Sequence, residues 1–351
     1  MIRNDANILR QALIDMSGAG QGETGAQDLV LPRFLPLVEH TRVFEPETFL
    51  VIGHRGAGKT ELFRALQSTS GVEAIASVSK RINAQELGRT RWLVGYSNAG
   101  SDFPAGLVLE QFTKGRSPTD LQYVWLGFLL RVLARQNAFS PQKVPASLKA
   151  ILSDPTVSIG GVFETVQKSL EPAFSLLDQL DAGLEQSKSW IFITYDELDR
   201  VSAADWDQLA TIVRGLIQFW SSNSRRWRRL RPKIFLRKDL YDRAAIVGPD
   251  VSKISAQRLE LTWSPRDLYA LLAKRFVNQA PEAVKAYLGK MMPEGEQRVS
   301  LGWFPTATRL EEYSPMVIRI CGDFMGASAG KGWTFSWIPT HLQDGHGQVL
   351  P

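Results

Sequence analysis

One glycine-rich segment of the chain has the residue types and spacing needed to hold a phosphate chain. Residues 53–60 read GHRGAGKT, which fits the pattern G-x-x-x-x-G-K-T. The glycines let the backbone fold so that several N–H groups point at one anion, and the helix expected next would present its N-terminus to that anion. Lys59 would reach the β- and γ-phosphates, and the Thr60 hydroxyl would bind Mg²⁺. A chance glycine-rich turn is the alternative interpretation.

This loop predicts binding of a nucleoside triphosphate together with Mg²⁺. His54 occupies a variable position of the pattern, so its side chain is expected to point away from the nucleotide. The residues expected to contact the nucleotide are Gly53, His54, Arg55, Gly56, Ala57, Gly58, Lys59, Thr60 and Glu61.

A second segment supplies the carboxylates that such a loop needs. Residues 190–199 read WIFITYDELD, an apolar run that ends in acids. Asp196 would hold Mg²⁺ through its water shell, and Glu197 would polarise the water that attacks the γ-phosphate. Asp199 is expected to be structural, paired with Arg200 or another neighbour. A solvated acidic turn after a core strand is the alternative interpretation.

The identity of the base is predicted from what accompanies these motifs. A carboxylate next to the Mg²⁺ ligand separates the chain from many kinases and GTPases. The sequence also has no Asn-Lys-x-Asp segment of the kind that reads guanine. ATP is therefore expected as the nucleotide. The residues expected to be catalytic are Lys59, Glu197 and Arg237, and the expected Mg²⁺ ligands are Thr60 and Asp196.

Basic residues concentrate between Arg225 and Lys233, where the sequence reads RRWRRLRPK. Three interpretations stay open. The segment is a solvated helix end, where cations are favoured; an arginine finger for a neighbouring subunit's nucleotide; or a contact with nucleic-acid phosphates. Arg237 follows an expected strand, where it would sense the γ-phosphate or be an ordinary charge at a strand end.

The elements that must position these residues alternate between strands and helices. Such alternation predicts βαβ units and a parallel sheet with helices on both faces. The apolar runs expected to be strands are 48–53, 91–97, 190–195, 233–236 and 258–263. Segments expected to be helical are 4–16, 61–67, 119–136, 163–184, 205–220, 265–277, 281–292 and 315–325, with 17–27 a flexible linker and 140–161 mostly loop around one short helix.

The predicted fold is therefore α/β: a three-layer P-loop NTPase core with a parallel sheet, followed by a helical lid. We expect an N-terminal segment at 1–44, the ATPase core at 45–263 and the lid at 264–351. No strand pattern is visible after Ser264.

Composition sets outer bounds on these expectations. The chain has 351 residues, one cysteine and a formal net charge of +5. A single cysteine excludes an intrachain disulfide and fits a reducing compartment. The most apolar stretch, 123–134, is too short to span a bilayer. The start of the sequence lacks the apolar run of a signal peptide. We therefore expect a cytoplasmic protein with no membrane segment.

The order GHRGAGKT, WIFITYDELDR, KIFLR and LTWSPRDLYALLAKRF resembles the STAND and KAP-type P-loop ATPases. These belong to the additional-strand-catalytic-glutamate division, alongside AAA+ proteins. The resemblance covers about residues 45 to 330. It implies that Arg237 is a first sensor and that Arg319, on an expected lid helix, is a second one. KAP relatives often carry membrane-spanning insertions, and this chain has none in its sequence pattern.

The resemblance implies a molecular switch whose nucleotide state controls assembly, as in bacterial antiviral defence or signalling systems. Its partners would be copies of itself or an effector protein. Two alternatives remain: an AAA+-like ATPase acting on nucleic acid through Arg225 to Lys233, and a nucleotide-binding scaffold that does not hydrolyse.

Overall fold

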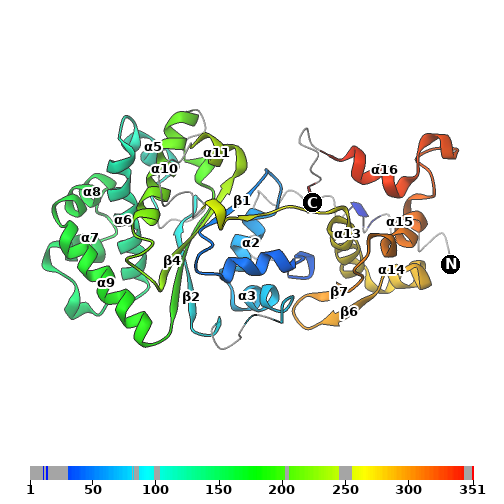
Figure 1. Cartoon of the computed structure of the whole chain (residues 1–351), viewed down its shortest axis with the longest axis horizontal. Coiled ribbons are helices and arrows are strands. Elements are labelled where there is room, and N and C mark those ends of the chain that lie inside the picture. Colours follow the sequence, from blue (N-terminus) through cyan, green and yellow to red (C-terminus); the bar gives the residue numbers. More distant parts are fainter. Residues whose placement is uncertain are drawn as a thin grey trace. The chain divides into compact units, whose positions relative to one another are not determined.

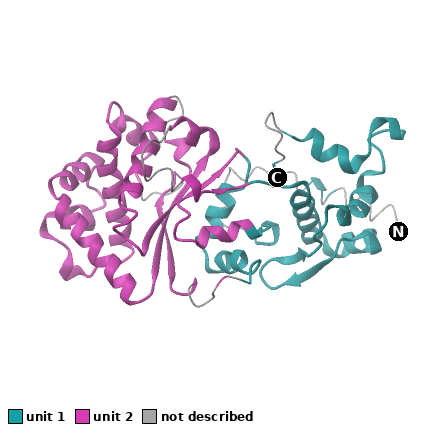
Figure 2. Ribbon diagram, in the orientation of Figure 1, with its two compact units in different colours: residues 1–38, 56–80, 262–351 teal, residues 39–55, 81–261 magenta. Residues whose placement is uncertain are grey.

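The computed structural model describes residues 11, 13–14, 31–80, 82, 87–98, 103–201, 205–244, 255–343 and 350–351 (Figure 1). Most of the expected helix 4–16 and all of the linker 17–27 lie outside these residues. The chain divides into two compact units, each built from separate stretches of sequence (Figure 2). Unit 1 comprises residues 1–38, 56–80 and 262–351, and unit 2 comprises 39–55 and 81–261. The expected boundary after residue 263 lies beside one of these divisions, whereas 56–80 group with the C-terminal residues.

A five-stranded, all-parallel sheet organises unit 2. Its strand order is β2-β3-β4-β1-β5. Strand β4 therefore lies between β1 and β3, pairing Gly53 with Arg237 on one side and Tyr195 with Ile234 on the other. The strands are β1 (Leu50–Gly53), β2 (Thr90–Tyr96), β3 (Trp190–Tyr195), β4 (Leu230–Arg237) and β5 (Leu259–Glu260). All five predicted strands exist, and the α/β class with a parallel sheet is confirmed.

Helices pack on this sheet through a core rich in leucine and aromatic side chains. The central pair is α6 (Pro118–Arg135) and α10 (Trp206–Ser222), where the Trp125 indole N–H donates to the Ile212 carbonyl at 3.2 Å. On β2, a side chain at Gly95 would lie 2.7 Å from the Tyr195 ring, so only glycine fits there. The remaining helices of unit 2 that lie wholly within the described residues are η2 (Val38–Phe44, which begins one residue before the unit), α5 (Gly106–Thr113), η3 (Pro141–Lys143), α7 (Ala146–Ser153), α8 (Ile159–Lys168), α9 (Leu170–Gln186), η4 (Leu198–Arg200) and α11 (Lys238–Arg243).

One expected helix is two. The apolar pattern over 163–184 predicts a single element, but α8 ends at Lys168 and α9 begins at Leu170. Pro172 lies in the first turn of α9, where its missing N–H costs nothing. In a continuous helix its ring would clash with the carbonyl of Lys168, four residues earlier. The break at Ser169 removes this clash.

Unit 1 contains the helices expected at the C-terminal end, and also a hairpin that the sequence analysis missed. The prediction that strands stop after Ser264 is wrong, because β6 (Gly295–Arg298) and β7 (Gly302–Pro305) form an antiparallel pair. The β6 residues are largely exposed and show no apolar alternation. The helices of this unit that lie wholly within the described residues are η1 (Leu31–Arg33), α2 (Lys59–Ala65), α3 (Thr69–Ala76), α13 (Pro265–Gln279), α14 (Pro281–Leu288), η5 (Gly289–Met291), η6 (Leu310–Tyr313), α15 (Ser314–Cys321), η7 (Ala329–Lys331) and α16 (Thr334–His341).

Polar side chains of α13 hold the hairpin in place. The Asn278 side-chain oxygen accepts from the Trp303 backbone N–H at 2.8 Å, and its amide nitrogen donates to the Trp303 carbonyl at 3.0 Å. The fully buried Lys274 ammonium donates to the Leu301 carbonyl. Cross-strand side-chain pairs usually stabilise a hairpin. Here, polar contacts from α13 to the hairpin backbone contribute to its stability instead.

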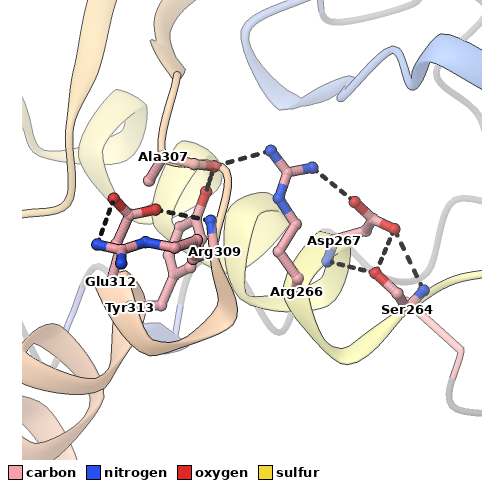
Figure 3. Close-up of polar contacts among 7 residues, drawn as sticks. All are labelled: Ser264, Arg266, Asp267, Ala307, Arg309, Glu312 and Tyr313. Atoms are coloured by element: carbon pink, nitrogen blue, oxygen red, sulfur yellow. Dashed lines mark hydrogen bonds and ion pairs between the residues drawn. The ribbon is translucent and has the colours of Figure 1, made fainter.

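The start of α13 carries a second polar network (Figure 3). Ser264 and Asp267 cap the helix reciprocally, with the Ser264 hydroxyl donating to the Asp267 carboxylate at 2.5 Å. Arg266 bridges the Asp267 carboxylate at 2.7 Å and the Ala307 carbonyl at 2.8 Å. Tyr313 donates to the same carbonyl at 3.2 Å. The network ties the first turn of α13 to the segment that precedes α15.

Candidate functional site

The glycine loop follows β1 and leads into α2, the order that the sequence predicts. Gly56 and Gly58 adopt left-handed backbone angles, with φ of 87° and 88°. Residues with a Cβ rarely adopt such angles, so these two positions depend on glycine. Lys59 and Thr60 form the first turn of α2 and are half-buried. The loop passes from unit 2, which ends here at Arg55, into unit 1, which begins at Gly56.

Trp263 supports this loop, a role that the sequence analysis did not assign. Its indole N–H donates to the Ala57 carbonyl at 3.1 Å. Its ring would lie 3.9 Å from a side chain placed at Gly58. The only signal was an aromatic residue just before the Ser-Pro-Arg-Asp start of α13.

Glu61 is engaged within its own helix. Its carboxylate forms an ion pair with Arg64 at 3.2 Å, one turn further along α2. This contact lies on the helix surface, with both side chains partly exposed. The Glu61 carboxylate therefore has a partner inside its own helix, although the sequence places this residue among the expected nucleotide contacts.

The acidic pair follows β3 directly, in unit 2. Asp196 is buried, and its backbone N–H donates to the Tyr96 carbonyl of β2 at 3.1 Å. Glu197 has a left-handed backbone with φ of 55°, a conformation that costs a residue with a side chain about 1–2 kcal/mol. Its carboxylate accepts from the Ser97 hydroxyl at 3.1 Å and pairs with Arg200 at 3.4 Å. The surroundings therefore hold Glu197 in an unfavourable conformation, a feature concentrated at functional sites.

Tyr96 adds a buried hydroxyl next to this pair. Its side chain is fully buried, and within the described residues its hydroxyl makes no hydrogen bond. Burial, together with the negative charge of Glu197, raises the pKa of Tyr96 above its usual value. The phenol is therefore neutral at physiological pH.

Arg237 ends β4, beside Gly53 in the sheet register. Its guanidinium makes a two-point contact with Asp239 at 2.6 and 3.1 Å and lies 3.5 Å from Asp199. It also lies 5.3 Å from the Trp206 ring centroid. The hydrogen bonds that Arg237 donates to Asp239, together with the charges of both acids, raise the pKa of Arg237. Asp199 therefore forms an ion pair with Arg237, whereas Arg200, the partner that the sequence suggested for it, pairs with Glu197.

The carboxyl edge of the sheet brings three of the predicted elements together within unit 2. Because neighbouring strands are parallel, β1, β4 and β3 end at the same edge. Gly53, Arg237 and the pair Asp196-Glu197 follow one another across this edge in that order. Lys59, Thr60 and Glu61 belong to unit 1.

The basic segment lies at the opposite, amino edge of the sheet. Its first residues, 225–229, form a turn after α10, which ends at Ser222, and Leu230 to Lys233 are the first residues of β4. The Asp181 carboxylate accepts three consecutive backbone N–H groups, those of Arg228, Arg229 and Leu230, at 2.7 to 2.9 Å. The interpretation of this basic segment as the end of a helix is therefore wrong, because α10 ends before the segment begins.

Several side chains of the segment have partners inside the protein. Arg226 makes a two-point ion pair with Asp178 at 2.6 and 2.8 Å. Arg229 lies over the Trp190 ring at 4.4 Å. Lys233 is fully buried and donates to the Thr48 carbonyl at 2.8 Å, and burial lowers its pKa well below the usual value. Lys233 therefore has no surface to offer a nucleic-acid phosphate.

Arg319 lies on α15, as the sequence predicts, with its guanidinium 4.6 Å from the Tyr287 ring centroid. Within the described residues, no group of three or more His, Cys, Asp or Glu side chains has the arrangement of a metal site. None of the helices in the same part of the chain combines the length and apolar character that a bilayer span requires.

Comparison of the chain with models of known protein families, with curated proteins and with solved structures gives no match.

Proposed function

We propose that this chain binds ATP with Mg²⁺ at the loop from Gly53 to Thr60 and hydrolyses it as a conformational switch. The observation that carries the proposal is the sheet order, in which only β4 separates β1 from β3. The start of the glycine loop and the acidic pair therefore occupy one edge of the sheet. Open parallel sheets bind their ligands outside this carboxyl edge. The intervening β4 also agrees with the additional strand in the name of the ATPase division that the motifs resemble.

The residues present suit the proposed ligands. Gly56 and Gly58 leave the loop without side chains where its backbone turns, so its N–H groups can approach a phosphate chain closely. The Thr60 hydroxyl and the Asp196 carboxylate are hard oxygen donors, which Mg²⁺ prefers. Lys59 would neutralise charge on the β- and γ-phosphates.

Glu197 is the proposed general base. A carboxylate at this place can accept a proton from water only if it is ionised and held toward the reacting group. The Ser97 hydroxyl donates to its carboxylate and Arg200 pairs with it, so two contacts hold this carboxylate in place. The left-handed backbone at Glu197 is consistent with a residue held for function rather than for stability.

Arg237 suits a positioning role better than direct contact with the nucleotide. Its guanidinium is already bound to Asp239 and Asp199, so a nucleotide would have to compete with two carboxylates. Through Asp199 it fixes the turn that carries Glu197, two residues away in the chain.

The switch would act on copies of this chain or on an effector protein in the cytoplasm. The nucleic-acid alternative has weaker support. Arg226 is paired with Asp178 and Lys233 is buried, so the segment presents less free positive charge than its sequence indicates.

Two variants test the proposal. Lys59→Ala should lower ATP affinity at least 100-fold in isothermal titration calorimetry, because it removes the cation that faces the β- and γ-phosphates. Glu197→Gln should keep ATP affinity within about twofold and lower the hydrolysis rate 10²–10⁴-fold, the usual contribution of a general base. Lys114→Ala, which removes an exposed lysine of unit 2, is the matched control and should change neither quantity.

Unchanged ATP affinity in Lys59→Ala would refute the nucleotide site. If Lys59→Ala loses binding but Glu197→Gln hydrolyses ATP at the wild-type rate, the base is wrongly assigned. If the wild-type chain binds ATP and turns none over, the non-hydrolysing scaffold is the correct alternative.

A further inference from the structure

A pocket of about 320 Å³ lies in unit 2, at the amino ends of β2 and β3. This size falls at the lower end of the range for small-molecule sites. It is far from the carboxyl edge, since Arg91 and Ile191 pair at the opposite end of these strands. The lining residues are Arg91, Asn137, Ala138, Phe139, Ser140, Lys143, Leu176, Gln179, Leu180, Gly183, Leu184 and Ile191.

The floor and the rim of this pocket differ in chemistry. Leu176, Leu184 and Ile191 are buried and apolar, and Phe139 and Leu180 are half-buried beside them. The rim carries two cations and no carboxylate. An apolar floor with a charged rim suits a ligand that has an apolar body and a charged head.

The two cations are available to such a head group. The Arg91 guanidinium donates one hydrogen bond, to the Gln136 carbonyl at 2.7 Å, which leaves further N–H donors on the same group. The Lys143 side chain is exposed and makes no ion pair within the part of the chain that the structure describes. Both charges face a pocket whose wall contains no acid, so the head group that fits is an anion.

Gly183 is a second, independent indication that the space is kept free. It lies in the last turn of α9 without a left-handed backbone, where alanine would stabilise the helix by about 1 kcal/mol. A side chain built at Gly183 would meet no atom within 4 Å. Packing therefore does not require glycine here, and a larger residue would extend into the open space at the wall of the pocket.

We propose that this pocket binds a small molecule with an apolar body and a single anionic head, such as a medium-chain carboxylate. The apolar body would lie on Leu176, Leu184 and Ile191. The head would contact Arg91 and Lys143. The proposal does not depend on the nucleotide site, because every lining residue lies in unit 2 at the amino edge of the sheet.

Calorimetric titration of the full chain with decanoate tests the proposal, with two control ligands. Acetate carries the head without the apolar body, and decyltrimethylammonium carries a similar body with a positive head. We expect saturable, one-to-one binding of decanoate and at least tenfold weaker binding of both controls. Equal binding of decanoate and decyltrimethylammonium would overturn the proposal, since it would show an apolar surface without charge preference.

Two variants locate the binding. Lys143→Glu reverses one rim charge and should weaken decanoate about tenfold, while Lys149→Glu makes the same change on α7 outside the pocket and should leave affinity unchanged. Gly183→Leu fills the pocket and should abolish binding without loss of helical circular dichroism, because it replaces a glycine in a helix. Wild-type affinity in both Lys143→Glu and Gly183→Leu would place the ligand elsewhere and overturn the proposal.

Discussion

Gly58→Ala is the most informative perturbation of the glycine loop, because strain and space can be separated at this position. The φ of Gly58 is 88°, and the nearest atom to an added Cβ would be a Trp263 ring carbon at 3.9 Å. That distance is an ordinary van der Waals contact. The cost of the substitution is therefore conformational, about 1–2 kcal/mol for a left-handed residue with a Cβ.

The loop can meet this cost in two ways, and both are measurable. If it keeps its conformation, the free energy of unfolding falls by about 1–2 kcal/mol. If it relaxes toward ordinary angles, its N–H groups turn away and ATP affinity falls, by about tenfold for each 1.4 kcal/mol of lost interaction. We expect the second effect to dominate, because a loop rearranges more readily than a packed core. Urea unfolding and calorimetric titration with ATP measure the two quantities on the same preparation.

Gly115→Ala is the matched control for this experiment. Gly115 also has a left-handed backbone, with φ of 73°, and nothing lies within 4 Å of an added side chain. It lies between α5 and α6, so the same strain acts outside the glycine loop. Gly115→Ala should lower stability alone. If Gly58→Ala keeps wild-type ATP affinity while both variants lose similar stability, the loop does not position the phosphates.

Three further predictions follow from single side chains. Trp263→Phe keeps the ring and removes the indole N–H donor to the glycine loop, so ATP affinity should fall three- to tenfold in the same titration, for a net hydrogen-bond contribution of about 1 kcal/mol. Asp181→Asn leaves at least one of three buried or half-buried backbone N–H groups without an acceptor, so urea unfolding should show a loss of about 1–3 kcal/mol. Burial, helped by the charge of Arg298, lowers the pKa of Lys274 to about 7. Between about pH 7 and 10.5 the unfolded chain therefore binds more protons than the folded chain. The free energy of unfolding should rise over this range, by up to about 1.4 kcal/mol per pH unit. Lys274→Met should remove this slope; an equal slope in the variant would contradict the assignment.

Much of the fold could be predicted because buried parallel strands leave a strong sequence signal. Apart from Thr194, the run from Trp190 to Tyr195 is apolar or aromatic, because both faces of a parallel sheet are covered. The same logic identified the other four strands of unit 2. Their order could not be predicted, since hydrophobic pattern does not encode which strand neighbours which.

The missed elements depend on polar contacts between distant residues. The β6–β7 hairpin is held by hydrogen bonds from Lys274 and Asn278 to its backbone. The glycine loop and the acidic pair were recognisable because their chemistry is local in sequence. Trp263 and Ser97 were not, because each acts on a residue that is distant along the chain.

The position of β4 between β1 and β3 also has a consequence for how the chain folds. Strand β1 has no partner among the strands that precede β4 in sequence, since Leu50 pairs with Ile234 and Val51 with Leu259. Such non-local pairing closes a very long loop and slows folding. The strand that leads into the glycine loop is therefore expected to join the sheet late, after β2 and β3 have paired. Until then its apolar residues stay exposed, which favours aggregation during folding.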